Sequence, residues 1–134
     1  MINAENEIFT DLATLLRTTY PGIYVTGERI NIPPSFPCVS IVEISNAVYR
    51  NSSTNCVMEN HAAVTYEVNV YSNKKSGKKA ECKAIIGTID ERLAQLNFTR
   101  RMLEPIPNME DATIYRMLGR YRAVIGNDYK IYRR

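Results

Sequence analysis

The chain has 134 residues, which allows one buried core and is short for two domains, so we expect a single domain over residues 1–134. Hydrophobic residues make up 45% and charged residues 23%, a globular balance that argues against wholesale disorder. No apolar run approaches the roughly 20 residues that span a bilayer, and residues 1–7 are polar and acidic, unlike a signal peptide. We therefore expect a protein that stays in a cytoplasm and has no membrane partner.

The net charge of +3 is unevenly distributed along the chain. Residues 1–72 contain three Arg or Lys and seven Asp or Glu, whereas residues 73–134 contain fourteen and seven. Such a bipolar chain suits head-to-tail contact between copies or docking on an acidic surface. The alternative is that distant charges intermix once the chain folds.

The first third of the chain predicts a helix, a short strand and a long loop. Apolar residues recur on one face of a helix over residues 3–18, and Asn3 can cap its opening turn. A short strand at residues 23–26 follows. Three prolines within residues 27–37 exclude a central strand and predict an ordered, extended loop.

Residues 38–45 form a Val- and Ile-rich strand that is apolar on both faces, which predicts a central place in a sheet covered on both sides. The next segment, residues 46–55, is polar and contains Arg50. We predict that it is a hairpin arm projecting from the sheet.

The centre of the chain is a long strand, a basic turn and an amphipathic helix. Even positions from 62 to 70 are apolar and odd ones are largely polar, so this strand buries one face. A helix over residues 80–96 can cover that face, since five apolar residues follow helical spacing: Cys82, Ile86, Ile89, Leu93 and Leu96. The chain then returns into a strand at residues 98–103. We expect this strand to pair in parallel with the long strand that precedes the helix, through a right-handed crossover.

Residues 113–125 alternate as another strand, with Arg116, Arg120 and Arg122 on one side and mainly apolar residues on the other. A turn at residues 127–128 leads into a possible edge strand at 129–132. The order of elements predicts an α+β fold: a mixed, mostly antiparallel sheet with two helices packed on one face.

No catalytic signature is present. His61 is the only histidine, and neither HExxH nor a cysteine pair at ligand spacing occurs. Glu110 and Asp111 could bind magnesium or transfer protons, but an adjacent pair like this more often solvates a loop. The three cysteines are expected to be reduced thiols. We therefore predict a protein that is not an enzyme and has no metal site and no cofactor.

Two basic clusters carry the functional content. The first, the lysine loop, lies within residues 72–79 and consists of Lys74, Lys75, Lys78 and Lys79. The second, the arginine row, consists of Arg116, Arg120 and Arg122, whose even-numbered positions stand about 7 Å apart per step. The row can meet DNA phosphates or carboxylates on a neighbouring subunit, or it can simply be a solubilising face.

The layout resembles that of the small tail-terminator proteins of long-tailed bacteriophages. The resemblance lies in the order of elements, the Pro-rich segment 32–37 before a strand, the lysine loop before the second helix, and the ending YRAVIG at residues 121–126. It covers most of the chain.

The resemblance implies an α+β virion protein that forms a ring, typically a hexamer, on the head-proximal end of the tail tube. Such a ring halts tube polymerisation and offers the surface to which the head attaches. The implied partners are further copies of the chain, the tail tube protein, a head-completion or stopper protein and, transiently, DNA, with assembly in the host cytoplasm. No active site is carried over, because the family has none.

The candidate interface residues are Arg50, the lysine loop and the arginine row. The alternative function is a small nucleic-acid-binding module that uses the same lysine loop and arginine row.

Overall fold

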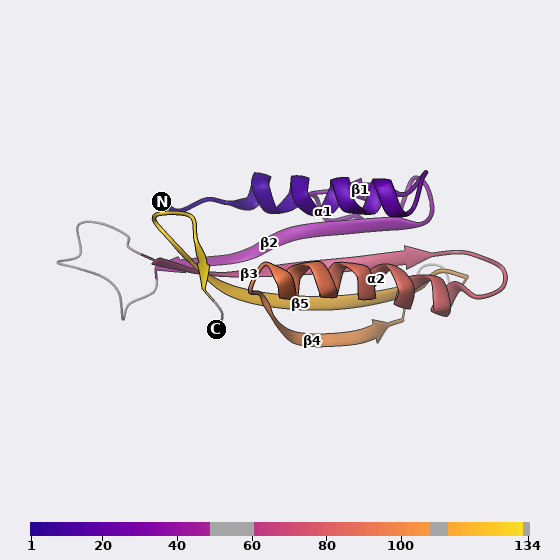
Figure 1. The fold of residues 1–134 in the computed structure, drawn as a ribbon. Coiled ribbons are helices and arrows are strands. Elements are labelled where there is room, and N and C mark those ends of the chain that lie inside the picture. The colour runs from indigo at the N-terminus through magenta and orange to yellow at the C-terminus, as the bar shows by residue number, and fades with distance from the viewer. Residues whose placement is uncertain (49–60, 108–112, 133–134) are drawn as a thin grey trace.

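The computed structural model describes residues 1–48, 61–107 and 113–132. In this part of the chain two helices lie on one face of a mixed, mostly antiparallel sheet (Figure 1), so the predicted α+β architecture is confirmed. None of the described helices is long and apolar enough to cross a membrane.

The elements in chain order are α1 (Glu5–Thr19), β1 (Tyr24–Thr26), β2 (Cys38–Val48), β3 (His61–Ser72), α2 (Lys78–Gln95), β4 (Thr99–Ile106), β5 (Tyr115–Gly126) and β6 (Ile131–Tyr132). The strand order is β1-β2-β3-β5-β4, with β6 paired to β5. Among the described strands, β1 and β2 are the one pair that is parallel. In Figure 1, α1 lies along β2, and α2 lies across β3 and β5.

The predicted direct pairing of β4 with β3 is wrong. β5 lies between these two strands and pairs antiparallel with both, so β3 and β4 run in the same direction without sharing hydrogen bonds. The physical reason is that β5 also has an alternating apolar face. The position beside β3 places that face under α2, where it is buried.

The core lies between the helices and the sheet. α1 contributes Ile8, Leu12 and Leu16, and α2 buries Cys82, Ile85, Ile86, Ile89 and Leu93. The predicted stripe on α2 is therefore confirmed, except that Leu96, at the C-cap, is only partly buried. From the sheet, Tyr66 packs edge-on against Phe98, with ring centroids 5.5 Å apart.

Element boundaries differ from the predictions by a few residues. The N-cap of α1 is Ala4 and not Asn3, and no side-chain hydrogen bond caps the helix. Asn3 lies one residue earlier, where its Oδ1 accepts a hydrogen bond from the Glu5 backbone N–H at 3.2 Å. α2 begins at Lys78 because Gly77, at φ 85°, adopts the left-handed conformation that turns the chain into the helix. Pro105 lies inside β4 instead of ending it, which is tolerated because β4 is the last strand on its side of the sheet.

Neither of the described helices lies on the second face of the sheet, and the loop of residues 27–37 covers one end of that face. Ser40 Oγ donates to the Glu28 carbonyl at 2.8 Å, and the Tyr71 hydroxyl donates to the Ile30 carbonyl at 3.0 Å. The prediction that β2 is covered on both sides holds for its first four residues only, since Val42 is half-buried. Of the predicted arm at 46–55, residues 46–48 continue β2 beside β3, and the rest lies outside the described residues.

Candidate interaction surfaces

The arginine row lies on the sheet face opposite the helices. We call this surface the open face; the side chains of Val42, Glu67, Asn69, Met102 and the arginine row lie on it. The antiparallel register of β3 and β5 places Arg116 opposite Tyr71, Arg120 opposite Glu67, and Arg122 opposite Thr65. The prediction that the three arginines share one side of a strand is therefore in agreement with the register.

Two of the three arginines are bound by side chains of β3. Arg116 Nε donates to Asn69 Oδ1 at 2.9 Å, and the Arg116 guanidinium lies 5.5 Å from the centroid of the Tyr71 ring. Arg120 Nε donates to Glu67 Oε2 at 3.2 Å. Asn69 Nδ2 donates to Glu67 Oε1 at 3.3 Å, which joins the two contacts into one network that we call the polar ladder.

The polar ladder changes the interpretation of the row. Glu67 and Asn69 are only 6% and 3% exposed, so they act as buried acceptors that fix the arginines in place. Within the described residues Arg122 alone of the row has no hydrogen-bond or ion-pair partner. In the described residues, two cations of the arginine row are therefore fixed by side chains of β3, and the third, Arg122, is not.

The lysine loop is held in place by hydrogen bonds at both of its ends. Lys74 and Lys75 lie in the turn after β3, whereas Lys78 and Lys79 lie in the first turn of α2. Ser72 Oγ donates to Glu81 Oε1 at 2.6 Å and accepts from the Lys74 backbone N–H at 3.3 Å, which fixes both ends of the turn. Lys78 is half-buried and the other three lysines are exposed.

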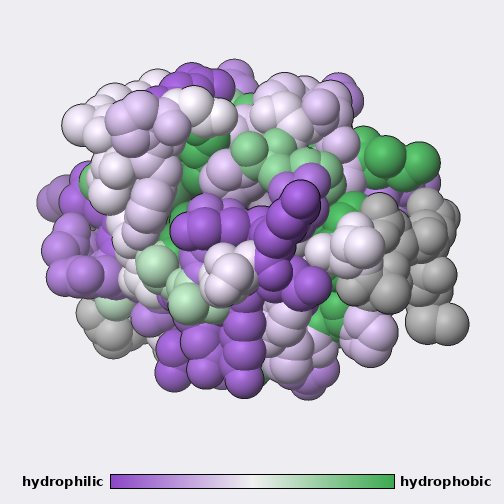
Figure 2. Space-filling model, turned by 90° about the vertical axis from the view of Figure 1, so that its right-hand side faces the viewer, coloured by the Kyte–Doolittle hydropathy of each residue, from purple (hydrophilic) through white to green (hydrophobic). Residues whose placement is uncertain are grey.

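Figure 2 looks onto this end of the molecule, the right-hand end in Figure 1, and shows hydrophilic surface over most of it. Because Tyr71 and Ser72 close β3, the register places Arg116 at this end too. Arg122 lies six residues farther along β5, about 20 Å away by strand geometry. Arg116 thus lies at the same end of the molecule as the lysine loop, whereas Arg122 lies far from that loop.

The remaining sequence candidates form no reactive site in the part of the chain that the structure describes. Arg50, Cys56, Glu110 and Asp111 lie outside the described residues. His61 begins β3 opposite Gly126. Among the described residues no group of three or more His, Cys, Asp and Glu could hold a metal ion.

The two described cysteines are buried thiols. Burial raises the pKa of Cys38 to about 11 and that of Cys82 to about 12, so both stay protonated at neutral pH. This agrees with the expectation of reduced, unreactive cysteines at these two positions.

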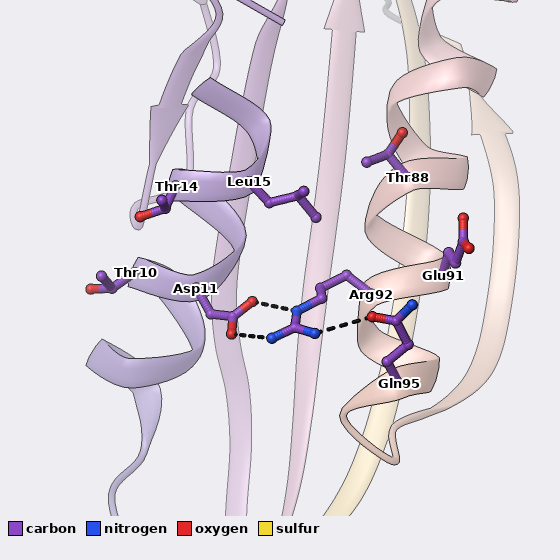
Figure 3. A pocket seen from close by; sticks show the side chains of 8 residues that line it. All are labelled: Thr10, Asp11, Thr14, Leu15, Thr88, Glu91, Arg92 and Gln95. Atoms are coloured by element: carbon purple, nitrogen blue, oxygen red, sulfur yellow. Dashed lines mark hydrogen bonds and ion pairs between the residues drawn. The ribbon is translucent and has the colours of Figure 1, made fainter. Parts of the chain in front are cut away.

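A groove between the helices was not foreseen from the sequence. It has a volume of about 600 Å³ and is bordered by α1 on one side and α2 on the other. In Figure 3, Leu15 of α1 and Thr88 of α2 point toward the space between the helices. Glu91, which also borders the groove, extends from the side of α2 that is away from α1. We call it the helix groove.

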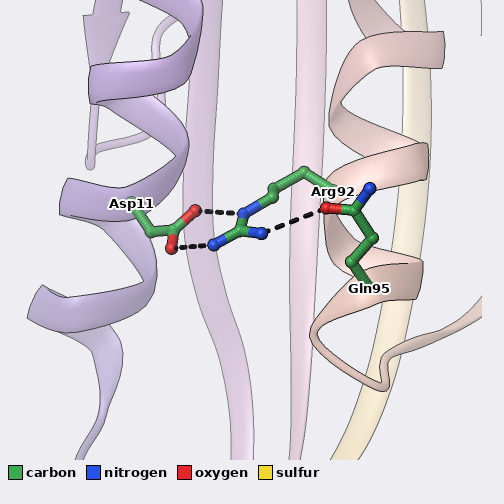
Figure 4. A network of polar contacts seen from close by, with 3 residues as sticks. All are labelled: Asp11, Arg92 and Gln95. Carbon is green, nitrogen blue, oxygen red and sulfur yellow. Dashed lines mark hydrogen bonds and ion pairs between the residues drawn. The ribbon is translucent and has the colours of Figure 1, made fainter.

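Polar contacts join the two helices at both ends of the helix groove. At one end Asp11 and Arg92 form a bidentate pair, with Arg92 Nε and Nη2 each 2.7 Å from a carboxylate oxygen. Gln95 accepts a third bond from Arg92 at 3.0 Å (Figure 4). At the other end the Tyr20 hydroxyl lies 2.8 Å from Thr88 Oγ1. The guanidinium of Arg92 holds the pKa of Asp11 below its usual value.

The sequence contains little that could have predicted the helix groove. Leu15 belongs to the apolar face of the predicted first helix, yet it lies half-exposed in the groove and not in the core. The Asp11–Arg92 pair joins residues 81 positions apart, and no local pattern reports such a contact.

No protein-family model and no curated protein matches this sequence. The class of the protein is therefore defined by its structure: an α+β protein in whose described residues both helices lie on one face of the sheet and the other face carries Arg116, Arg120 and Arg122.

Proposed function

We propose that this protein is a non-enzymatic virion component that joins with copies of itself into a ring on the head-proximal end of a phage tail tube. There it stops tube polymerisation and provides the surface to which the head attaches. The observation that carries the proposal is the open face, because a sheet face without helices that combines fixed arginines with apolar side chains has the composition of a protein interface.

The apolar part of the open face lies around the polar ladder. Val42, Met102 and Ile106, which the register places on this face, are half-buried, so each still presents apolar surface to solvent. Arg122, which has no hydrogen-bond or ion-pair partner among the described residues, adds a cation that can form a bidentate pair with a carboxylate of another subunit. The polar ladder holds its side chains in place before any partner arrives, which lowers the entropic cost of association.

The two faces of the molecule differ, and this supports a ring. When one face of a subunit contacts a different face of the next, the contact is heterologous and closes into a ring if the rotation allows. A hexamer, the tail tube protein and a head-completion or stopper protein are the partners that the proposal names. The site of action is the virion, after assembly in the host cytoplasm.

The test is to add the purified protein to polymerising tail tubes and to image the tubes by negative stain. We expect a ring at one end of each tube and a limited tube length. Tubes that grow to the same length with and without the protein, and that have bare ends, would contradict the proposal.

The matched variant for this test is Arg122→Glu. Reversal of Arg116 or Arg120 would place a new carboxylate beside Asn69 or Glu67 and disturb the polar ladder, whereas Arg122 has no such partner among the described residues. We therefore expect Arg122→Glu to fold normally and to assemble poorly. Normal assembly by this variant would separate the row from the proposed interface.

A second candidate function, nucleic-acid binding, is favoured by one observation: Lys74, Lys75 and Lys79 are exposed together at one end of the molecule. A DNA titration at several salt concentrations tests it, since phosphate contacts give a steep negative salt slope. Replacing the three lysines by Ala should reduce that slope, while Lys130→Ala, an exposed lysine elsewhere, should not. Salt-insensitive or absent binding would leave the structural function as the better proposal.

A further inference from the structure

The loop of residues 27–37 holds an exposed isoleucine in a fixed position. Ile32 is 75% exposed, the largest exposed fraction among the described large hydrophobic residues after Met1. The loop around it is fastened by the Ser40 and Tyr71 hydrogen bonds to the Glu28 and Ile30 carbonyls. The adjacent prolines fix their own φ angles, so the loop presents Ile32 with little conformational freedom to lose.

This loop and the helix groove lie on opposite sides of the sheet. Ser40 and Tyr71, which fasten the loop, lie on the sheet face away from the core, whereas both walls of the groove are helices on the other face. The groove volume of about 600 Å³ falls in the range of sites that take a whole small ligand. It therefore has room for a loop tip and not merely for one side chain.

The charges beside the two features are opposite. Arg29 is an exposed cation in the loop, and Glu91 is an exposed anion at the rim of the helix groove. Neither has a hydrogen-bond or ion-pair partner among residues 1–48, 61–107 and 113–132. In contrast, Asp11 and Arg92 within the groove already neutralise each other.

We propose that the loop of residues 27–37 of one copy docks in the helix groove of the next copy. Ile32 packs against Leu15 and the methyl group of Thr88, and Arg29 pairs with Glu91. The occupant of the groove is a second copy of this chain, because the chain itself presents an apolar residue and a charge that match the groove.

The proposed contact is heterologous, since loop and groove lie on opposite faces of the sheet, and its repetition gives a closed ring or an open filament. It rests on the proposed self-assembly and names the surfaces that carry it. The open face beside the loop then lies toward the helices of the neighbour, where Arg122 can also contribute.

A charge exchange between copies tests the contact. In Arg29→Glu the loop meets Glu91 of the next copy with the wrong sign, and in Glu91→Arg the groove meets Arg29 with the wrong sign. We expect each variant alone to associate at least about tenfold more weakly than the wild type. An equimolar mixture should regain association, because every junction in an alternating assembly then joins opposite charges.

The measurement is mass photometry of each variant and of the mixture over a concentration series. Lys130→Glu, which changes an exposed charge outside both features, is the control and should associate like the wild type. A mixture that associates no better than the two single variants would overturn the proposed contact, although the ring itself could still form through other surfaces. A wild type that stays monomeric would overturn both proposals.

The apolar half of the contact has its own test. Ile32→Asp should weaken association by about tenfold to a hundredfold, because a buried Ile side chain contributes on that order to binding. Because Ile32 is exposed in the single chain, thermal unfolding of the variant should match the wild type under conditions where both are monomeric. Unchanged association would show that Ile32 does not enter the groove.

Discussion

The two faces of the sheet are built by the same strands and are stabilised in different ways. In β3, Tyr66, Val68 and Val70 point under the helices and are almost completely buried in the apolar core. Glu67 and Asn69 point to the open face and are almost as well buried, but within the polar ladder. The helix-covered face derives its stability from the removal of apolar area from water, whereas the open face relies on hydrogen bonds whose net contribution is small and whose geometry is demanding.

The largest expected effect is on the helix-covered face. Ile89 of α2 is completely buried, so Ile89→Ala removes buried methyl and methylene groups and leaves a cavity. We expect the free energy of unfolding to fall by about 2–5 kcal/mol, measured by urea denaturation. If this variant does not fold, Ile89→Val, with an expected loss of about 0.5–1.5 kcal/mol, replaces it.

The exposed counterpart is Ile32→Ala, which should change the stability of the monomer by less than about 0.5 kcal/mol. If Ile89→Ala and Ile32→Ala lowered the free energy of unfolding by the same amount, the assignment of Ile89 to the core and of Ile32 to the surface would be contradicted.

The next effect concerns the polar ladder on the open face. Glu67→Ala removes the acceptor of Arg120 and of Asn69 and leaves the buried amide group of Asn69 without this partner. The expected loss is about 1–3 kcal/mol in the free energy of unfolding. Glu67→Gln keeps the size and one acceptor oxygen, so its loss should be smaller. If both variants lose the same amount, the charge and not the shape determines the contribution of Glu67.

A stabilising change is available on the outer side of α2. Gly87 lies inside the helix, and a Cβ added there would meet nothing within 4 Å. Gly87→Ala should therefore raise the free energy of unfolding by about 0.5–1 kcal/mol, because alanine loses less backbone entropy in a helix. A decrease in thermal stability would show that this side of the helix is covered by another part of the chain.

The smallest effect is the pH dependence of the Asp11–Arg92 pair. The folded pKa of Asp11 lies below its ordinary value of 3.8, mainly because Arg92 donates hydrogen bonds to it. Its stabilisation is therefore complete above that value and disappears as the pH falls through the folded pKa. Both side chains are about one-third exposed, so Asp11→Asn should cost at most about 1 kcal/mol at neutral pH and almost nothing once the pH lies below the folded pKa of Asp11.

Glu43 provides a control of opposite sign for this titration. Its folded pKa is raised, chiefly by burial and also by the nearby carboxylate of Glu5. Glu43 therefore destabilises the fold progressively as the pH rises through its unfolded and then its folded pKa. At neutral pH, Glu43→Gln should be more stable than the wild type, and this difference in the free energy of unfolding should become smaller at acidic pH. A loss of stability at neutral pH, as expected for Asp11→Asn, would contradict the environment assigned to Glu43.

Local patterns in the sequence predicted a good part of the fold. The alternation in β3 and β5 and the apolar spacing in α2 are set by neighbours two to four residues apart, so they predicted strands, a helix and the side of the sheet that carries Arg116, Arg120 and Arg122. The same alternation marks Glu67 and Asn69 as facing away from the core.

The contacts between distant segments could not be predicted in this way. The insertion of β5 between β3 and β4 depends on whether the apolar face of β5 or that of β4 packs better under α2. The binding of Arg120 by Glu67 depends on the register of that pairing, and the Asp11–Arg92 pair on how the two helices lie together. The candidate site was therefore predicted as a set of charges, while its state of pairing and the helix groove were not.

The central claim is that this protein acts by binding copies of itself. Sedimentation velocity of the wild type over a hundredfold concentration range tests it most directly. The account predicts one closed oligomer of fixed mass at high concentration, which negative stain should show as a ring. A single monomer peak at every concentration, also in the presence of tail tubes, would contradict the account.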